Sequence, residues 1–402
     1  MMHKQIGAVL LVAGTCVGSG MIALPMVLAK LGIVPSILLM VIIWFFMYYT
    51  SLVNLELNLQ ANHGLALGAL GKHFSGRAAE LIGTICLKLL SYSLLAVFIY
   101  GGSSILQELV ASKMLAKYSF STIATGCTLI AMGLLLLPIQ WIDYFNRFLF
   151  VGLLVVVAIL IIGLATTIHW SELPLFSQHY GTPSVWVALI PVVFTSFGFQ
   201  VIFHTLTNYC SKNLNMLRQA FLWGSLIPAV VYIVWTCSIL SVIYQDNPLF
   251  YDQMVAGKAE VGELIQVLSG IAKSQSVQLL IWGISLLAIA TSVLGVGVGL
   301  CDSIKGMLAP NITRPRLLNL LASVATLLPA YLVVMYVPNA FITILGFAGM
   351  ILAVIAILLP VYLFWQIKTE RYYYSELNKQ SLILLSTGVA GAVIICEIFN
   401  ML

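Results

Sequence analysis

The stretch Gly14-Thr15-Cys16-Val17-Gly18-Ser19-Gly20 interrupts the first apolar run of the chain, which extends from about Ile6 to Lys30. Three glycines and two hydroxyl side chains within these seven residues disfavour a continuous helix, because glycine carries a large backbone entropy and hydroxyls compete for backbone hydrogen bonds. We predict a helix that is broken in the middle of a membrane and whose freed backbone groups bind a solute. The alternative is a face of small residues that lets two helices pack closely.

The composition is that of a polytopic membrane protein. Of 402 residues, 61% are hydrophobic and 8% are charged, whereas soluble domains contain about 25% charged residues. The 18 lysine and arginine residues exceed the 13 aspartate and glutamate residues by 5, an excess that fits membrane orientation better than nucleic-acid binding. The seven cysteines form no Cys-x-x-Cys pair. We therefore expect no metal site and no cofactor.

Eleven apolar stretches are long enough to cross a membrane as helices. They cover approximately residues 5–30, 34–59, 77–109, 120–138, 146–168, 184–208, 218–243, 277–304, 317–337, 339–366 and 381–400. With the N-terminus inside, twelve lysine and arginine residues fall in cytoplasmic segments and five in outer segments. This positive-inside bias predicts a cytoplasmic N-terminus, and the odd number of spans places the C-terminus outside.

The spacing of the spans suggests an internal repeat. A long interruption follows the second span, at about 60–76, and another follows the seventh, at about 244–276. Because five spans are an odd number, the second set of five would be inverted relative to the first. We predict a first repeat over 1–170, a second over 171–370 and an additional helix over 371–402. The fold class is therefore all-α and integral to the membrane.

The sixth span carries a second interruption, Pro191-Val192-Val193-Phe194-Thr195-Ser196-Phe197-Gly198-Phe199-Gln200. Pro191 removes a backbone donor, and the residues that follow place polar or flexible groups at membrane depth. This stretch opens the second repeat as the glycine-rich stretch opens the first. Two interrupted helices at corresponding positions of two halves indicate the binding site of a secondary transporter. A proline kink with a packing glycine is the structural alternative.

Several stretches also resemble a known family. Val17-Gly18-Ser19-Gly20-Met21-Ile22-Ala23-Leu24-Pro25 resembles the signature that opens amino acid/polyamine/organocation transporters. Together with Phe145-Asn146-Arg147-Phe148-Leu149-Phe150 and Phe194-Thr195-Ser196-Phe197-Gly198-Phe199, it is similar to the bacterial hydroxy/aromatic amino acid permeases. The resemblance covers residues 5 to about 366. The chain differs from the family pattern at Gln200, where histidine is expected, and at His204, where proline is expected.

The resemblance implies a leucine-transporter-type fold of five plus five helices, with discontinuous first and sixth helices and an eleventh helix. It also implies import of an aromatic amino acid, tyrosine first, across the bacterial cytoplasmic membrane by proton symport. A proton-carrying role of the family histidine does not transfer to Gln200. Sodium coupling, and tryptophan or serine as substrate, remain as alternatives.

A broken helix can bind both charges of an amino acid without a charged side chain. The N–H groups of Gly20, Met21 and Ile22, with the positive end of the helix dipole, suit the carboxylate. Carbonyl groups where the sixth span stops, and near the end of the first half-helix, suit the ammonium. Aromatic side chains beside the breaks would contact the substrate ring, although packing in the core is their ordinary role. The expected substrate-binding residues are Thr15, Cys16, Gly18, Ser19, Gly20, Met21, Tyr92, Phe194, Thr195, Ser196, Phe197, Gly198, Phe199 and Gln200.

The residues that couple transport to an ion are less well defined. In the leucine-transporter fold implied by the resemblance, a hydroxyl pair such as Thr291 and Ser292 often forms a sodium site, and the alternative is hydrogen bonding within the helix. Glu56 and Asp302 are proton-carrier candidates or interfacial charges. His204 has a suitable ordinary pKa but is also typical of a structural hydrogen-bonding group.

Other functional classes fit the sequence less well. A membrane enzyme would need a catalytic constellation such as His-Glu-x-x-His, which this chain lacks. A channel would need repeated filter rings and usually an oligomeric pore, and ATP-driven transport would need a Walker motif. We therefore predict a transporter that works as a monomer in the lipid bilayer and carries an amino acid together with a proton, with sodium as the alternative ion.

Overall fold

The computed structural model describes residues 2–18, 20–61, 64–114, 118–137, 148–149, 151–153, 155–159, 173–210, 213–272, 275–310, 312, 314–337, 340–367 and 372–402. Every regular element within these ranges is a helix. The helices of the first part are α1 (Met2–Cys16), α2 (Gly20–Leu28), α3 (Ile33–Gln60), α4 (Leu67–Ser75), α5 (Arg77–Met114) and α6 (Phe120–Leu135). Those of the second part are α8 (Pro183–Ser196), the 3-10 turn η1 (Gln200–Ile202), α9 (Phe203–Tyr209), α10 (Leu214–Asp246), α11 (Pro248–Ala256), α12 (Val261–Ile271), α13 (Gln275–Leu308), α14 (Pro315–Tyr336), α15 (Ala340–Ala353), the π-helical turn η2 (Val354–Leu358), α16 (Leu359–Trp365), the 3-10 turn η3 (Ser375–Asn378) and α17 (Gln380–Met401).

Seven of the described helical segments are long and apolar enough to cross a membrane, and the pair formed by α1 and α2 makes an eighth when the two helices are counted as one broken span. That pair bends by 50° at its break. The apolar helices α6 and α8 are shorter, and most of the predicted span 146–168 lies outside the described residues. The number of eleven crossings therefore stays a prediction, whereas a multi-pass helical membrane protein is confirmed.

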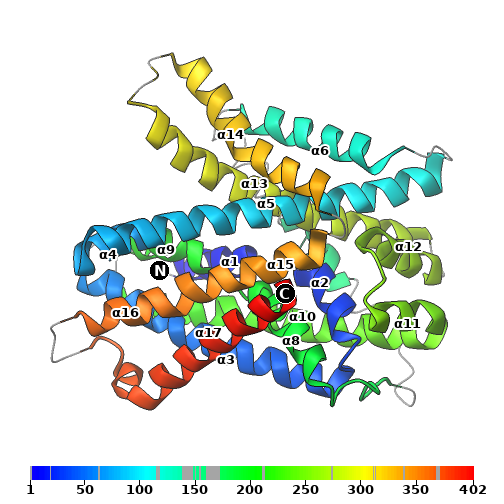
Figure 1. The fold of residues 1–402 in the computed structure, drawn as a ribbon, viewed down its shortest axis with the longest axis horizontal. Helices are drawn as coiled ribbons and strands as arrows, with labels where there is room; N and C mark the ends of the chain where they lie inside the picture. The colour runs from blue at the N-terminus through cyan, green and yellow to red at the C-terminus, as the bar shows by residue number, and fades with distance from the viewer. Residues whose placement is uncertain are drawn as a thin grey trace.

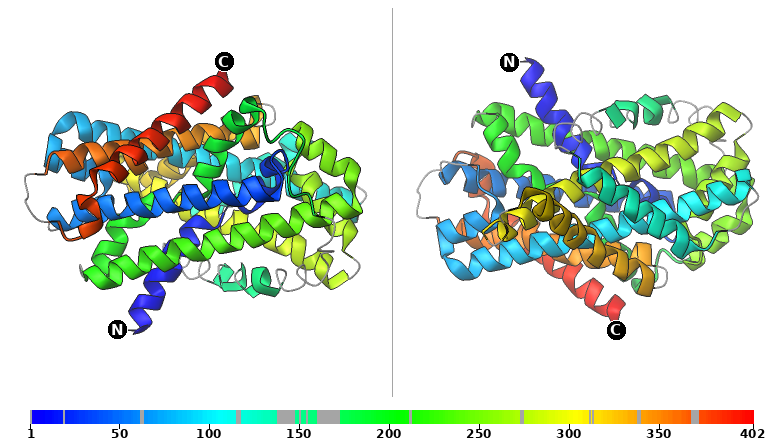
Figure 2. Two further views of the ribbon diagram at one scale, coloured as in Figure 1. Left: turned by 90° about the horizontal axis from the view of Figure 1, so that it is seen from below. Right: turned by 90° about the horizontal axis from the view of Figure 1, so that it is seen from above.

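The long helices α3, α5 and α10 run along the long axis of the molecule (Figure 1). The short helix α4 packs on α5 at one end of that axis, and α11 and α12 lie at the opposite end, where α12 packs on α5 and α13. The beginning of α1 and the end of α17 protrude on opposite sides (Figure 2). The half-helix α2 packs between α8 and α10, so the middle of the first span lies inside the bundle.

Five prolines lie in the interior of described helices, where each leaves the carbonyl of the preceding turn without its backbone donor. For four of them, all except Pro228 of α10, a polar side chain of a distant helix donates a hydrogen bond to that carbonyl, which is how a membrane helix tolerates proline. The four proline–donor pairs are Pro25 with Trp235 (Nε1 to the Met21 carbonyl, 2.6 Å), Pro191 with Asn400 (Nδ2 to the Val187 carbonyl, 3.1 Å), Pro329 with Tyr92 (Oη to the Ala325 carbonyl, 2.9 Å) and Pro360 with Asn54 (Nδ2 to the Ala356 carbonyl, 3.3 Å).

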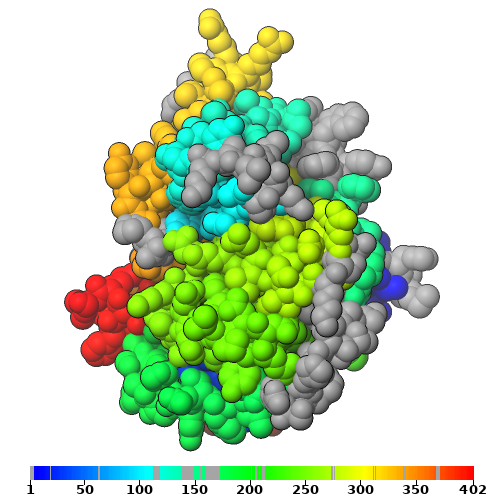
Figure 3. Space-filling view, turned by 90° about the vertical axis from the view of Figure 1, so that its right-hand side faces the viewer, coloured from blue at the N-terminus to red at the C-terminus, as the bar shows by residue number. Residues whose placement is uncertain are grey.

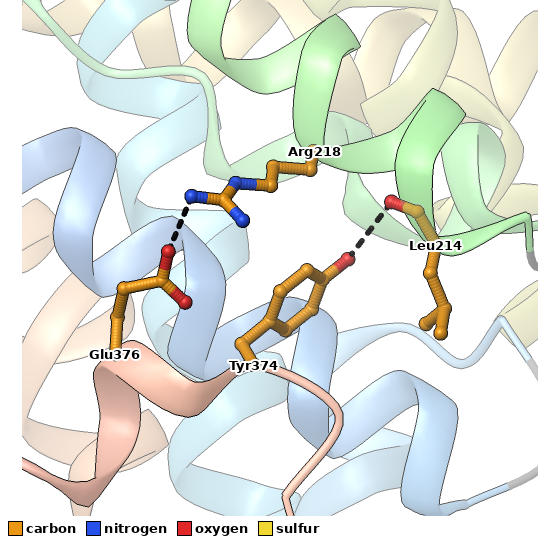
Figure 4. A network of polar contacts seen from close by, with 4 residues as sticks. All are labelled: Leu214, Arg218, Tyr374 and Glu376. Carbon is orange, nitrogen blue, oxygen red and sulfur yellow. Dashed lines mark hydrogen bonds and ion pairs between the residues drawn. The ribbon is translucent and has the colours of Figure 1, made fainter.

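The segment before α17 ties the two long helices α3 and α10 together. Glu56, near the end of α3, is fully buried and accepts hydrogen bonds from the backbone N–H of Tyr373 (3.0 Å) and of Tyr374 (3.2 Å). Arg218 of α10 forms an ion pair with Glu376, and the Tyr374 hydroxyl lies 3.5 Å from the Leu214 carbonyl (Figure 4). The segment that leads to α17 is thus fixed to both α3 and α10.

Candidate functional site

The breaks predicted in the first and sixth spans meet in the structure. The helix α1 ends at Cys16 and α2 begins at Gly20, while α8 ends at Ser196 and regular structure resumes at Gln200. A methyl group built on Gly20 would lie 2.8 Å from the Cβ atom of Ser196 and 2.8 Å from the hydroxyl oxygen of Tyr232. Only glycine therefore fits where the two breaks touch.

Side chains of α10 satisfy the backbone on both sides of the first break. The Tyr232 hydroxyl donates to the Cys16 carbonyl (2.6 Å), and the Trp235 indole donates to the Met21 carbonyl (2.6 Å). The Met21 N–H donates to the Gly18 carbonyl (3.1 Å), so it is not free for a carboxylate as the sequence predicted. The Cys16 carbonyl, an expected partner of the ammonium, already accepts one hydrogen bond and retains only its second lone pair.

The second break is held mainly by its own residues. The Phe197 N–H donates to the Phe194 carbonyl (3.2 Å), and the Gly198 N–H donates to the Thr195 carbonyl (3.0 Å). The Gln200 side chain accepts from the Phe199 N–H through Oε1 (2.8 Å). Because the helix stops at Ser196, the last carbonyl groups of α8 point toward the break and have acceptor capacity left.

A cavity of about 740 Å³ opens on both breaks. It continues past residues 65–70 at the start of α4 and past Lys88 of α5, toward the end of the molecule that carries α4. The predicted site residues that line it are Thr15, Cys16, Gly18, Gly20, Thr195, Ser196, Gly198, Gln200, Thr291 and Ser292. Its volume is within the range of about 300–1,000 Å³ typical of small-molecule sites.

Five predicted substrate-binding residues do not line this cavity: Met21, Tyr92, Phe194, Phe197 and Phe199. The side chains of the three phenylalanines and of Met21 are almost fully buried within the helix bundle, and Phe197 packs edge-on against Tyr232. Tyr92 uses its hydroxyl for the proline–donor pair with Pro329. Packing between helices, which the sequence alternative also allowed, therefore accounts for their positions.

Sequence reasoning did not select several residues that do line the cavity. Phe98 of α5 and Phe203 of α9 supply aromatic rings, and Asn54 and Asn58 of α3 supply amide groups. The two asparagines stand one turn apart within an apolar span, which is a readable signal of polar groups at membrane depth. Nothing in the sequence distinguishes the two phenylalanines from the other aromatic residues of the spans.

The coupling candidates are in three different environments. Thr291 and Ser292 line the cavity, and the Ser292 hydroxyl oxygen lies 2.9 Å from a methyl group built on Gly18. Both hydroxyls donate to carbonyl groups of their own helix, which leaves oxygen lone pairs available. Asp302 is paired with Lys305 at 3.5 Å, outside the cavity. Ser19 and the side chain of His204 lie outside the described residues.

Glu56 is a buried residue that does not line the cavity. It is fully buried, and its carboxylate accepts from the Gln60 side chain (2.7 Å) as well as from the backbone of Tyr373 and Tyr374. The described cavity lining contains no carboxylate and no described imidazole; Lys88 is its one charged side chain. A zwitterion bound beside the two helix breaks would therefore contact mainly backbone groups and hydroxyls.

The placement of Glu56 predicts a structural effect of its replacement. In Glu56→Gln, the amide oxygen can keep the two backbone N–H donors, but the negative charge and one of the two acceptor oxygens are lost; a hydrogen bond to a charged group contributes about 1.5–3 kcal/mol and a neutral one about 0.5–1.5 kcal/mol. We expect a lower apparent Tm of the purified protein and normal uptake per folded molecule. The matched control is Glu80→Gln, whose exposed pair with Lys72 contributes about 0–1 kcal/mol. Loss of pH-driven uptake at an unchanged Tm would instead identify Glu56 as a proton carrier.

The helices, the paired breaks and the cavity define a multi-pass membrane protein with an internal cavity between its helices. The model of the tryptophan/tyrosine permease family matches residues 1–397. The chain is 31% identical to tyrosine-specific transport system 1 of Haemophilus influenzae, over 91% of this chain and 88% of that protein. It is 27% identical to glutamine transporter 2 of Aliivibrio fischeri (90% and 88% covered) and 27% identical to the low affinity tryptophan permease of Escherichia coli O157:H7 (100% and 97% covered).

The chain belongs to the tryptophan/tyrosine permease family. It is therefore an amino acid permease of the bacterial inner membrane, and the resemblance noted in its sequence motifs is confirmed.

Proposed function

We propose that this permease imports an aromatic amino acid, tyrosine first, by secondary active transport coupled to protons. One observation carries the proposal: two helix breaks touch at Gly20 and Ser196 and open on one cavity. Backbone groups of both breaks would hold the charged part of the substrate, as half-helix ends do in transporters with discontinuous helices.

The choice of an aromatic substrate rests on the relatives and on the cavity lining. Relatives named for tyrosine and for tryptophan match nearly the whole chain. Phe98 and Phe203 line the same cavity as the breaks, so a substrate ring has aromatic partners there. A stacked or edge-on ring pair contributes about 0.5–1.5 kcal/mol beyond the buried area. Because another relative is named for glutamine, glutamine belongs among the test substrates.

The helix contacts support a five-plus-five inverted repeat over 1–170 and 171–370, followed by α17. Under this assignment the second and seventh spans are α3 and α10, the third and eighth are α5 and α13, and the fourth and ninth are α6 and α14. Each of these equivalent pairs is in contact. The short helices that follow the second and seventh spans are also equivalent: α4 packs on α5, and α12 packs on α13. They lie at opposite ends of the molecule (Figure 1), as two repeats of inverted orientation require.

The substrate carboxylate would bind at the start of α2, where N–H groups and the helix dipole favour an anion. Gly18, Gly20 and the Ser19 hydroxyl belong to this half of the proposed site. The ammonium would bind the carbonyl groups at the end of α8, above all that of Ser196, with the free lone pair of the Cys16 carbonyl. Both charges are then met without an intramembrane ion pair, which the described lining does not offer.

The distribution of lysine and arginine supports a cytoplasmic N-terminus and an outer C-terminus. The end of the molecule that carries α4 would then face the cytoplasm. The cavity runs from the breaks toward this end, past Lys88 and residues 65–70. The structure would accordingly represent an inward-open state of a monomeric transporter.

Sodium coupling is the second candidate, and the geometry of Thr291 and Ser292 favours it. Hydroxyl oxygens next to the carbonyls of a helix break are suitable ligands for a small hard cation. The hydroxyl of Ser292 faces Gly18 at the first break. By contrast, no carboxylate in the described lining offers a proton carrier.

The deciding experiment measures uptake of radiolabelled tyrosine into proteoliposomes under an imposed pH gradient or an imposed sodium gradient. We expect uptake driven by the pH gradient and competition by phenylalanine and tryptophan but not by serine or glutamine. Uptake that follows sodium and is lost in Ser292→Ala would establish the second candidate instead. Counterflow of tyrosine, measured without a pH or sodium gradient, reports substrate binding and translocation independently of ion coupling. Absence of counterflow would refute the assignment of tyrosine as a substrate.

A further inference from the structure

Besides Glu56, the described residues contain one other buried acidic side chain, Glu397 of α17. Its exposed fraction is 2%. The carboxyl group lies against the backbone of α15, since a methyl group built on Gly346 would be 2.6 Å from Oε2 and 2.9 Å from Oε1. Glu397 therefore lies in the interface that α17 forms with α15 and α8, and the transport mechanism described above does not use it.

The surroundings of Glu397 favour an uncharged carboxylic acid. Among the described residues its hydrogen-bond partner is Asn400, whose Nδ2 lies 3.2 Å from Oε2, and no lysine or arginine of this part of the chain pairs with it. The carboxylate of Glu56, by contrast, has three donors. A buried carboxylate with neither a cation nor several donors is costly, because the interior solvates the charge poorly.

The elements packed against α17 supply no counter-charge for Glu397. The elements α8, α15 and η2 contain no ionisable side chain, and on α17 itself the adjacent ionisable group is the Cys396 thiol. The other elements in contact with α17, α3 and η3, have as ionisable residues Tyr48, Tyr49, Glu56 and Glu376. Both of these glutamates lie near the start of α17, about 25 Å along that helix from Glu397 at a rise of 1.5 Å per residue. The tyrosines are neutral at physiological pH.

The contact between α8 and α15 connects this interface to the second helix break. A methyl group built on Gly349 of α15 would overlap the Pro191 carbonyl oxygen, so the two backbones touch. Farther along α8, the Thr195 hydroxyl donates to the Leu345 carbonyl of α15 (2.8 Å), and Thr195 lines the cavity. A movement of α8 away from α15 at this end would therefore open a path from the cavity toward Glu397.

On the other side, Asn400 lies between Glu397 and the surface. Its Nδ2 also donates to the Val187 carbonyl of α8 (3.1 Å), and the residue is exposed. The end of α17, in red, reaches the surface of the molecule at the left of Figure 3. With the C-terminus outside, as proposed, this surface faces the outer solution. A parting of α8 from Asn400 would expose Glu397 to that solution.

We propose that Glu397 is the proton-binding residue of this transporter. Its carboxylate binds a proton from the outer solution while α8 is parted from α17, and the neutral acid is buried when the interface closes. When α8 parts from α15 at Thr195, the acid gives this proton to water in the cavity and becomes a carboxylate again. The inference rests on the proposed proton coupling and assigns it to a residue outside the cavity lining.

Accumulation of radiolabelled tyrosine in proteoliposomes under a pH gradient, with the membrane potential clamped at zero, tests the assignment on the full chain. If one proton moves with each tyrosine, one pH unit supports up to about tenfold accumulation by the native protein, since both ratios correspond to the same free energy. Glu397→Gln has the shape of the neutral acid but cannot release a proton. We expect it to keep its Tm and tyrosine counterflow, to equilibrate tyrosine without accumulation, and to show no tyrosine-dependent proton entry.

The matched control is Glu56→Gln, which alters the other buried acid and should keep accumulation per folded molecule. Glu397→Asp retains an ionisable group and should restore part of the accumulation. Native-level accumulation by Glu397→Gln, or loss of its counterflow at an unchanged Tm, would overturn the assignment and leave the proposed function standing. Absence of accumulation by the native chain under the pH gradient would refute the proposed proton coupling itself.

A measurement on the native chain needs no variant. Dicyclohexylcarbodiimide is an apolar reagent that attacks protonated carboxyl groups. We expect mass spectrometry to find it on Glu397 and not on Glu56, together with loss of the accumulation driven by the pH gradient. An unmodified Glu397, or full accumulation after its modification, would also overturn the assignment.

Discussion

Replacement of Gly20 by leucine is expected to abolish tyrosine uptake while the protein still inserts and is recovered at normal yield. Even the first added carbon would lie 2.8 Å from Ser196 and 2.8 Å from Tyr232, both in buried positions. Overpacking of this kind costs about 1–3 kcal/mol, and about 1.4 kcal/mol corresponds to a tenfold change in an equilibrium. Initial rates of uptake in proteoliposomes, normalised to inserted protein, measure the effect.

Two further glycines provide the comparison for this variant. Gly388→Leu introduces the same side chain into α17, where a methyl group built on the glycine has no described atom within 4 Å outside the local backbone, and should transport normally. Gly18→Leu should be impaired, but less than Gly20→Leu, because its nearest neighbour is the rotatable Ser292 hydroxyl. Native-level uptake by Gly20→Leu would show that the contact between the two breaks is not needed for transport.

Trp235→Phe should reduce both uptake and Tm, because it leaves the Met21 carbonyl without a donor. Pro25 cannot supply the missing N–H, and the indole of Trp235 does so at 2.6 Å. A buried carbonyl that loses its partner costs about 1–3 kcal/mol. Since Met21 is the second residue of α2, we expect the loss to loosen the half-helix that begins at the break.

The proline offers an internal rescue. In Pro25→Ala, the new backbone N–H can bond to the Met21 carbonyl, so the combined variant Pro25→Ala/Trp235→Phe should recover most of the lost Tm. The matched cycle is Pro329→Ala with Tyr92→Phe, a proline–donor pair away from the cavity, which should show rescue of Tm with little change in uptake. If Trp235→Phe lowered Tm equally in the native chain and in Pro25→Ala, Trp235 would act by packing and not by its hydrogen bond.

The sequence was informative where a feature depends on local composition. The glycines and hydroxyls at 14–20 and the run from Pro191 to Gln200 marked both helix breaks, because the cost of continuing a helix is read from neighbouring residues. The side chains that hydrogen-bond to the backbone at the first break could not be predicted from neighbouring residues. Trp235 and Tyr232 reach the first break from more than 200 positions away, as the separations of 214 and 216 residues show.

The aromatic part of the site was harder to predict for the same reason. Phe194, Phe197 and Phe199 flank the second break in sequence, yet all three rings are buried in the protein core. Phe98 and Phe203 line the cavity because of the packing of α5 and α9, which no sequence pattern specifies. The prolines are visible in the sequence. The side chains that donate hydrogen bonds to the carbonyls before them are not, because the tertiary arrangement of the helices brings them there.

The fixation of Glu56 also has a consequence for the last helix. Its carboxylate is buried in α3, and the backbone of Tyr373 and Tyr374 supplies two of its three hydrogen-bond donors. Without the segment that leads to α17, Gln60 would be the one of these three donors left to the carboxylate. That segment therefore stabilises the end of α3 as well as the position of the helix that follows it.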